Sequence, residues 1–365
     1  MSEIPLTTIV GSATFAVGVV FGWAARASEF CTMGALSDMV LMGDRRRLRA
    51  WVLAMAVALL GSQALQAAGL VNLGKSIYLG PSIPWAGAIL GGLMFGYGMT
   101  LSGGCGAKTL VRLGGGNLKS LVVMLVVGLF ATMTLKGLLA MERIALEQAT
   151  NLSPARLGAA DSGLPALLAG TGLPEAAARL LCVLALAGGA LAWCLRDADF
   201  RAARGKIAGA LVIGLCIPAG WAVTGILGAD EFDPVALASF SFIAPMGDGL
   251  IYLMTYTGST INFGIAAVGG VIAGSFLAAR LSGSFAVEGF ADADDMLRHL
   301  AGGALMGTGG VLAMGCTIGQ GLSGLSTLSL TSFLALAAII LGGILGLRSL
   351  EEGGLLPGLR ALLRR

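Results

Sequence analysis

Residues 300–347 contain no Asp, Glu, Lys, Arg or His. Because a membrane-spanning helix needs only about 20 apolar residues, this uncharged run is long enough for two crossings. Its middle, AMGCTIGQGLSGLSTL at 313–328, is rich in glycine and small hydroxyl residues. Non-helical backbone at membrane depth needs protein or a water-filled cavity to satisfy its polar groups. The run therefore predicts two membrane helices with a break near their junction.

The composition of the whole chain agrees with lipid as its surroundings. Only 12% of its residues are charged, whereas soluble domains carry about 25%. Glycine supplies 58 of 365 residues, and glycine lets membrane helices approach closely. The net charge of +3 is small and spread over the loops, so a nucleic-acid-binding surface is excluded. We expect an all-α polytopic protein that is embedded in membrane lipid.

The number and direction of the crossings follow from uncharged runs and basic residues. Further spans are expected in the runs 4–25, 50–74, 76–107, 207–229 and 249–279, and near 118–140 and 176–195, which gives about nine crossings. Basic residues follow alternate crossings, and the positive-inside rule then puts the N-terminus outside and the C-terminus inside. These residues are Arg45, Arg46, Arg47, Arg49, Lys108, Arg112, Lys119, Arg196, Arg201, Arg204, Lys206, Arg280, Arg348, Arg360, Arg364 and Arg365.

The two halves of the chain resemble each other. GGLMFGYGMTLSGGC at 91–105 aligns without a gap with GGALMGTGGVLAMGC at 302–316, and both end in Gly-Cys. An odd number of helices between the repeats would invert the second one, and inverted repeats place a shared site near the midplane. We expect an N-terminal repeat over 1–140, an external loop and linking helix over 141–205, an inverted repeat over 206–350 and a cytoplasmic tail over 351–365.

The six cysteines divide into two groups. Cys182, Cys194 and Cys216 lie in ordinary apolar segments, where a thiol behaves as a small hydrophobe. Cys105 and Cys316 instead follow Gly104 and Gly315 at equivalent repeat positions, and this symmetry favours a substrate site over simple packing. No C-x-x-C pair is present and His299 is the sole histidine, so neither a metal site nor a cofactor is expected.

Cys31 is the third candidate. It lies in FCTMGALSDMVLMGD, a glycine-containing segment too short for a crossing, which predicts a short or re-entrant helix. Its counterpart in the second repeat lies near Ser241, and Asp38 matches Asp248. We interpret both aspartates as structural, because a carboxylate would repel an anion.

Polar residues near the cysteines leave alternatives open. Lys108 and Arg112 share one helical face and either draw an anion to the inner mouth or serve as positive-inside anchors. Three other side chains either donate hydrogen bonds to a substrate or bond back to their own helices. These are Thr32, Thr317 and Gln320.

A path lined by neutral thiols suits a particular kind of solute. A thiol is a weak donor and a soft, polarizable acceptor. Small hydrated cations prefer carbonyls or carboxylates, and sulfate prefers Arg, Lys or backbone amides. The cysteines therefore favour a solute with an exposed sulfur or a similar soft atom.

Three segments carry a resemblance to a known family. FCTMGALSDMVLMGD, LSGGCGAKTLVRLGGGNLKSL and AMGCTIGQGLSGLSTL resemble the three cysteine motifs of the YeeE/YedE family, and within it the thiosulfate-uptake, TsuA-like branch. The resemblance covers nearly the whole chain. It implies a bacterial inner-membrane protein with nine transmembrane helices plus short helices, which imports thiosulfate without cutting it and is not an enzyme.

The resemblance also implies roles for individual residues. Cys31, Cys105 and Cys316 match the cysteines that are thought to pass thiosulfate inward through S–H···S hydrogen bonds. A small sulfurtransferase-like protein related to TusA is implied as the cytoplasmic partner. Two alternatives remain at this point: transport of another sulfur or selenium species, and a membrane thiol oxidoreductase, against which the lack of C-x-x-C argues.

Overall fold

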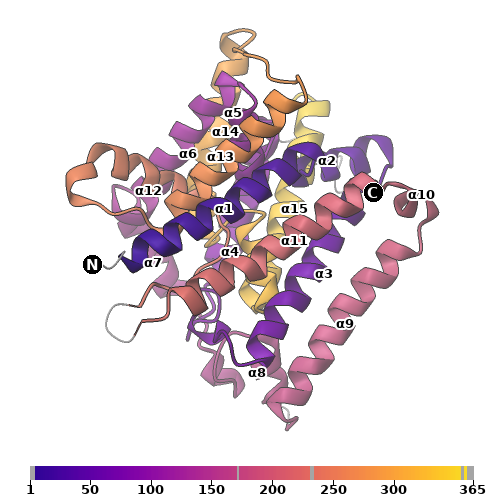
Figure 1. The fold of residues 1–365 in the computed structure, drawn as a ribbon, viewed down its shortest axis with the longest axis vertical. Helices are drawn as coiled ribbons and strands as arrows, with labels where there is room; N and C mark the ends of the chain where they lie inside the picture. The colour runs from indigo at the N-terminus through magenta and orange to yellow at the C-terminus, as the bar shows by residue number, and fades with distance from the viewer. Residues whose placement is uncertain (1–4, 171, 231–233, 355–356, 360–365) are drawn as a thin grey trace.

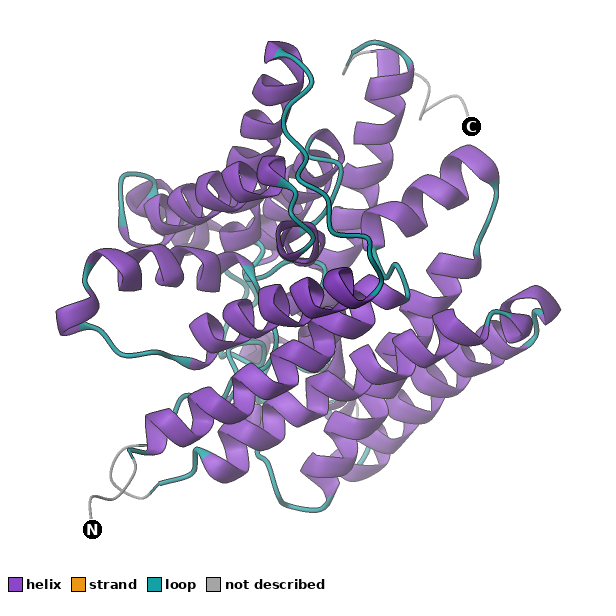
Figure 2. Ribbon diagram, turned by 45° about the horizontal axis from the view of Figure 1, so that its top comes forward, coloured by secondary structure: helices purple, strands orange, loops and turns teal. Residues whose placement is uncertain are grey.

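The computed structural model describes residues 5–170, 172–230, 234–354 and 357–359. Within them the chain is helical, with isolated bridges but no strand, as Figures 1 and 2 show. Arg360, Arg364 and Arg365 of the expected basic cluster, and most of the expected tail, lie outside the described residues.

Eight segments of the described chain are long and apolar enough to cross a membrane. Their principal helices are α1 (Leu6–Ala27), α3 (Arg46–Ala67), α4 (Trp85–Leu101), α6 (Leu118–Lys136), α9 (Glu175–Leu195), α11 (Arg204–Ala222), α13 (Phe263–Leu281) and α15 (Leu330–Glu351). A ninth long helix, α14 (Ala293–Leu312), is less apolar because its first turns carry Asp294, Asp295 and Arg298. The expectation of an all-α, multi-pass membrane protein is confirmed.

Short helices separate the long ones. They are α2 (Thr32–Ser37), η1 (Asp38–Met42), η2 (Leu73–Lys75), α5 (Gly106–Gly114), α7 (Ala140–Thr150), η3 (Pro154–Leu157), α8 (Leu164–Ala169), α10 (Ala198–Ala202), η4 (Val223–Leu227), α12 (Ile243–Met254), η5 (Tyr256–Gly258) and η6 (Gly319–Gly324). Of these, η1, η4 and η6 are π-helices. The Cys31 segment forms the short α2–η1 helix that the sequence predicted.

Uncharged runs do not always coincide with single helices. The run 249–279 contains the end of α12, a loop and then α13, which begins where the Asn262 side chain accepts a hydrogen bond from Ile265 N at 2.9 Å. The run 300–347 contains α14 and α15, with the predicted break between them. Caps and glycines, rather than charged residues, set where the helices begin and end in these two runs.

Glycines bring the central helices together. α4 packs between α14 and α15, and α1 packs along α13. At the α4–α15 crossing, a Cβ on Gly96 would overlap the carbonyl oxygen of Ile339. Because lipid tails are as apolar as the side chains, such close backbone packing is a main source of association between membrane helices.

The partners of the helices follow a pattern. α1 packs on α13 while α3 packs on α11, and α4 packs on α15 while α6 packs on α14. If α1, α3, α4 and α6 correspond to α11, α13, α14 and α15, exchanging the halves reproduces these pairs. The inverted repeat itself stays a prediction, which this pairing supports.

Candidate functional site

Each of the three predicted cysteines stands at the start of a short helical segment. Cys31 is the N-cap of α2, and its Sγ accepts a hydrogen bond from Gly34 N at 3.3 Å. Cys105 directly precedes α5. Cys316 lies three residues before η6, and its Sγ accepts from Gly319 N at 3.4 Å. Where backbone N–H groups already donate to the sulfur, the thiol hydrogen is left to donate elsewhere.

Segments from both halves of the chain bring Cys31, Cys105 and Thr317 together, whereas the Cys316 side chain is held by backbone groups of Gly319 and Phe242. The Cys31 and Cys105 side chains lie within hydrogen-bonding reach of each other. The Thr317 hydroxyl lies within hydrogen-bonding reach of Cys105, so the residue after Cys316 contacts one member of the pair. All three cysteines are buried, with exposed fractions of 9%, 2% and 0% for Cys31, Cys105 and Cys316.

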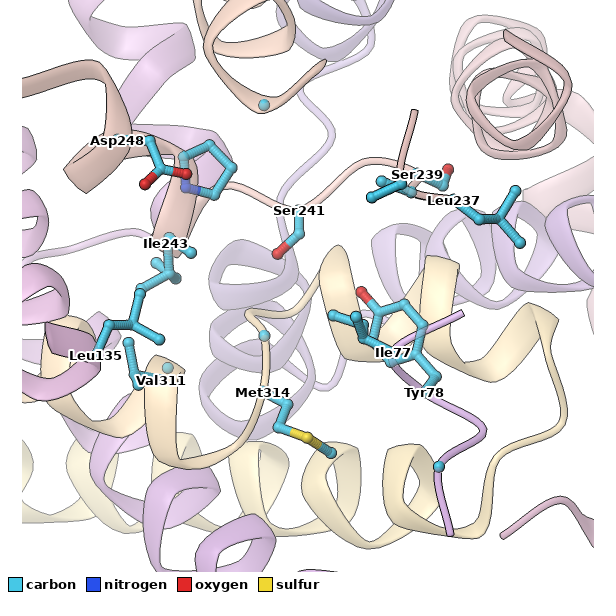
Figure 3. Close-up of a pocket in the computed structure, with 18 of the residues that line it drawn as sticks. Ile77, Tyr78, Leu135, Leu237, Ser239, Ser241, Ile243, Asp248, Val311 and Met314 are labelled. Carbon is cyan, nitrogen blue, oxygen red and sulfur yellow. The ribbon is translucent and has the colours of Figure 1, made fainter. Parts of the chain in front are cut away.

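A cavity of about 620 Å³ leads toward Cys316; it is called the outer cavity because residues of the loop that the sequence predicts to be external line it. Figure 3 shows Tyr78, Ser241 and Met314 among its lining side chains. Gly315, the residue before Cys316, also lines it. Arg143, Glu147 and Asn151 of the α7 region line it as well, so the cavity faces the end of the molecule where α7 lies (Figure 1).

Two hydroxyl groups meet where the cavity approaches η6. A Cβ on Gly319 would lie 2.6 Å from Ser241 Oγ and 3.5 Å from the Tyr78 hydroxyl. Tyr78 also interacts electrostatically with Cys316, and burial raises the pKa of its hydroxyl. The phenol therefore stays neutral and is available as a donor.

Basic residues stand on the other side of the cysteines. Lys108 lies one turn into α5 and interacts electrostatically with Cys31 and Cys105. Neither Lys108 nor Arg112 takes part in an ion pair within the described residues. Arg112 also lines a second cavity of about 430 Å³ together with Arg26 and Lys119. Glu288 also lines the second cavity and Lys119 is paired with Asp295, so the positive charge near the cysteines comes from Lys108 and Arg112.

The remaining predicted site residues differ in the partners that their side chains contact. The Thr32 and Thr317 hydroxyls are buried; within the described chain Thr32 has no hydrogen-bond partner, and Thr317 has none besides the Cys105 thiol that it faces. The Gln320 amide donates to Ala313 O across the break, so its NH₂ group holds the backbone there. Gly104 packs against the Lys108 stem, and Gly315 has a φ of 158°.

The two aspartates take ionic partners. Asp38 lies 3.4 Å from the Arg47 guanidinium. Asp248 lines the outer cavity and lies 3.9 Å from Lys136 Nζ. Cys194 donates to Arg49 O at 3.3 Å, and in the described residues no group of His, Cys, Asp or Glu could hold a metal ion.

Sequence reasoning missed two lining residues. Tyr78 lies in an irregular loop whose sequence, SIYLGPSIP, gives no sign that it folds back beside Cys316. In the sequence, Met314 is only the residue that precedes the Gly-Cys pair. Its positive φ of 55°, which only the structure reveals, marks it as unusual.

Comparison with known proteins identifies the family. Residues 27–345 match the family described as Sulphur transport. The thiosulfate transporter TsuA of Escherichia coli K12 is 28% identical over 340 residues, which cover 89% of this chain and 90% of the relative. TsuA of Spirochaeta thermophila is 27% identical over 336 residues, covering 89% and 94%.

A more distant likeness is local. The probable transporter YedE of Escherichia coli K12 is 35% identical over 97 residues, which cover 26% of this chain and 22% of YedE. The family match extends over most of the sequence and agrees with the prediction from the three cysteine segments. The chain therefore belongs to the Sulphur transport, or YeeE/YedE, family of membrane proteins.

Proposed function

We propose that this protein carries thiosulfate into the bacterial cytoplasm, through a path lined by Cys316, Cys105 and Cys31. The names of the two relatives that match along most of the chain support the substrate. The observation that carries the proposal is that Cys105 lies beside Cys31, Thr317 and Lys108, while a cavity lined by Gly315 approaches Cys316. No chemical conversion of the substrate is proposed.

The chemistry of the thiols fits thiosulfate. The anion has one terminal sulfur, to which a thiol S–H can donate. Each such contact is weak, below the roughly 0.5–1.5 kcal/mol of an ordinary net hydrogen bond. A conducting path gains from weak contacts, because the substrate must bind well enough to enter and loosely enough to leave. Gly34 and Gly319, which donate their N–H groups to Cys31 and Cys316, favour this outward use of the S–H.

Several other residues have roles in this proposal. The Tyr78 and Ser241 hydroxyls bind the oxygen atoms of thiosulfate where it leaves the outer cavity. Thr317 donates beside Cys105, and Thr32 does so beside Cys31, since Thr32 lacks a protein partner in the described chain and Thr317 has only the Cys105 thiol. Lys108 attracts the dianion toward the inner mouth. Gly104 and Gly315 allow its close approach to the backbone.

We infer that the protein lies in the inner membrane with its N-terminus in the periplasm and its C-terminus in the cytoplasm. Figure 1 shows α2 and α10 at the end of the molecule where α1 finishes, away from α7. Arg45, Arg46, Arg201 and Arg204 belong to that end, and the positive-inside rule makes it cytoplasmic. A sulfurtransferase related to TusA would receive thiosulfate there.

The test is thiosulfate-dependent growth of bacteria that lack their other sulfur importers. We expect growth to fail with Cys31→Ala, Cys105→Ala or Cys316→Ala, provided the variants reach the membrane in normal amounts. Cys182→Ala is the matched control, because Cys182 packs in α9 with Leu59 and Ala187. Growth of all four variants at the wild-type rate would refute the thiol path. Competition of labelled thiosulfate uptake by selenium species separates the alternative substrates.

A further inference from the structure

Met314 lines the outer cavity together with Gly315, but Met314 alone in the break is partly exposed. From 309 to 329 every other residue is buried, whereas Met314 is partly exposed. Its side chain lies among those lining the outer cavity, below Ser241 in Figure 3. Gly315 and the fully buried Cys316 follow directly in the chain. Met314 therefore forms the part of the cavity wall that comes just before Cys316 in the chain.

The backbone at Met314 adopts a conformation suited to glycine. Its φ is 55°, in the left-handed region that a side chain disfavours. The aligned residue in the first half of the chain is Gly103, with a φ of 64°. Both breaks thus need the same turn, and one of them uses the residue that adopts it without strain. A methionine at this position carries backbone strain that a glycine would avoid, which favours a role for its side chain beyond the turn itself.

The chemistry of the methionine side chain indicates which role it has beyond the turn. Methionine is flexible and apolar, with three rotatable bonds, so it can fill an irregular gap and also move out of it. An apolar constriction excludes water and ions until it opens. Tyr78 and Ser241 line the same cavity and their hydroxyls lie near Gly319, so a solute that displaces Met314 finds polar groups close to Cys316.

We propose that Met314 is a movable apolar seal that separates the outer cavity from Cys316 and sets how readily a solute reaches that thiol. This inference rests on the proposed function, because it takes the outer cavity as the route to Cys316. It adds an access-controlling residue that is neither a thiol nor a hydrogen-bond donor. Shortening the side chain should open the route, and keeping its volume should not.

The test measures how fast Cys316 reacts with a small anionic methanethiosulfonate added outside intact cells. The Cys316 sulfur attacks the reagent's sulfenyl sulfur, methanesulfinate leaves, and mass spectrometry of the Cys316 peptide reports the mixed disulfide. Removing an apolar constriction should make Met314→Ala and Met314→Gly react about tenfold faster than wild type. Met314→Leu should react within about twofold of wild type, since it keeps the apolar volume. Leu237→Ala, a change in another wall of the cavity, is the control and should also stay near wild type.

Equal reaction rates in wild type, Met314→Ala and Met314→Gly would overturn the seal. Because Gly fits the left-handed backbone, Met314→Gly should melt no lower than wild type, which guards against misfolding as an explanation. A different result would refute the proposed function: the Cys316→Ala protein would retain thiosulfate uptake, whatever the reaction rates of the Met314 variants.

Discussion

The side chain of Cys105, which ends the break after α4, lies within hydrogen-bonding reach of Cys31, which begins α2. Neither thiol is in a C-x-x-C motif, and a buried pair from two separate helix starts is unusual for mere packing. Two adjacent thiols can relay a soft anion, and they can also form a disulfide. Oxidation of the pair distinguishes a relay from a disulfide.

Oxidation should join Cys31 to Cys105 and stop uptake. A disulfide would remove both S–H donors and draw the two helix starts together. We expect copper-phenanthroline to abolish thiosulfate uptake by proteoliposomes and dithiothreitol to restore it, with the cross-linked peptide identified by mass spectrometry. Cys31→Ala protein should form no such cross-link. Faster turnover of substrate by the oxidised protein than by the reduced protein would instead favour a thiol oxidoreductase.

Thr317→Val should impair transport without harming the fold. The Thr317 hydroxyl is buried beside Cys105 and has no other polar partner in the described chain, so its removal costs at most that weak contact. If it binds the substrate, losing one hydrogen bond of about 1–1.5 kcal/mol lowers apparent affinity about tenfold. Thr331→Val is the matched control, because that hydroxyl is also buried and unpartnered but lies in α15. Similar uptake kinetics in both variants would contradict a substrate role for Thr317.

Lys108→Met should raise the KM of uptake about tenfold, since a hydrogen bond to a charged group contributes about 1.5–3 kcal/mol. Lys108→Arg should retain most activity, because it keeps the charge. Arg196→Met is the control: Arg196 is exposed and, within the described residues, makes no ion pair. Uptake into proteoliposomes of defined orientation gives the values. An equal effect of the two methionine variants would mean that Lys108 is an ordinary cytoplasmic anchor.

Gly96→Ala should destabilise the protein by about 1–3 kcal/mol through overpacking. The added methyl group would overlap Ile339 O and lie 2.7 Å from Gly343 N, so α4 and α15 would have to separate. Gly188→Ala in α9 is the control, since nothing in the described chain lies within 4 Å of that Cβ. Melting in detergent should show a lower Tm for Gly96→Ala alone. Equal Tm values for both variants would refute close packing at Gly96.

Much of the architecture could be read from local sequence patterns. Uncharged length predicts the crossings, because hydrocarbon cannot hydrate charge. Glycine with small hydroxyl residues at 313–328 predicts the break after α14, and the short Cys31 segment predicts α2. Caps such as Asn262 divided one uncharged run in a way that charge alone does not reveal.

The sequence by itself determined that the chain spans a membrane many times and that Cys31, Cys105 and Cys316 stand at local breaks, since length, charge and glycine content act over a few neighbouring residues. Tertiary structure alone decided that Thr317 faces Cys105, that Tyr78 folds back beside Cys316 and that Met314 points into the outer cavity. These relationships join residues far apart in the chain. They depend on how glycine faces set the distance between packed helices, and no local pattern carries that information.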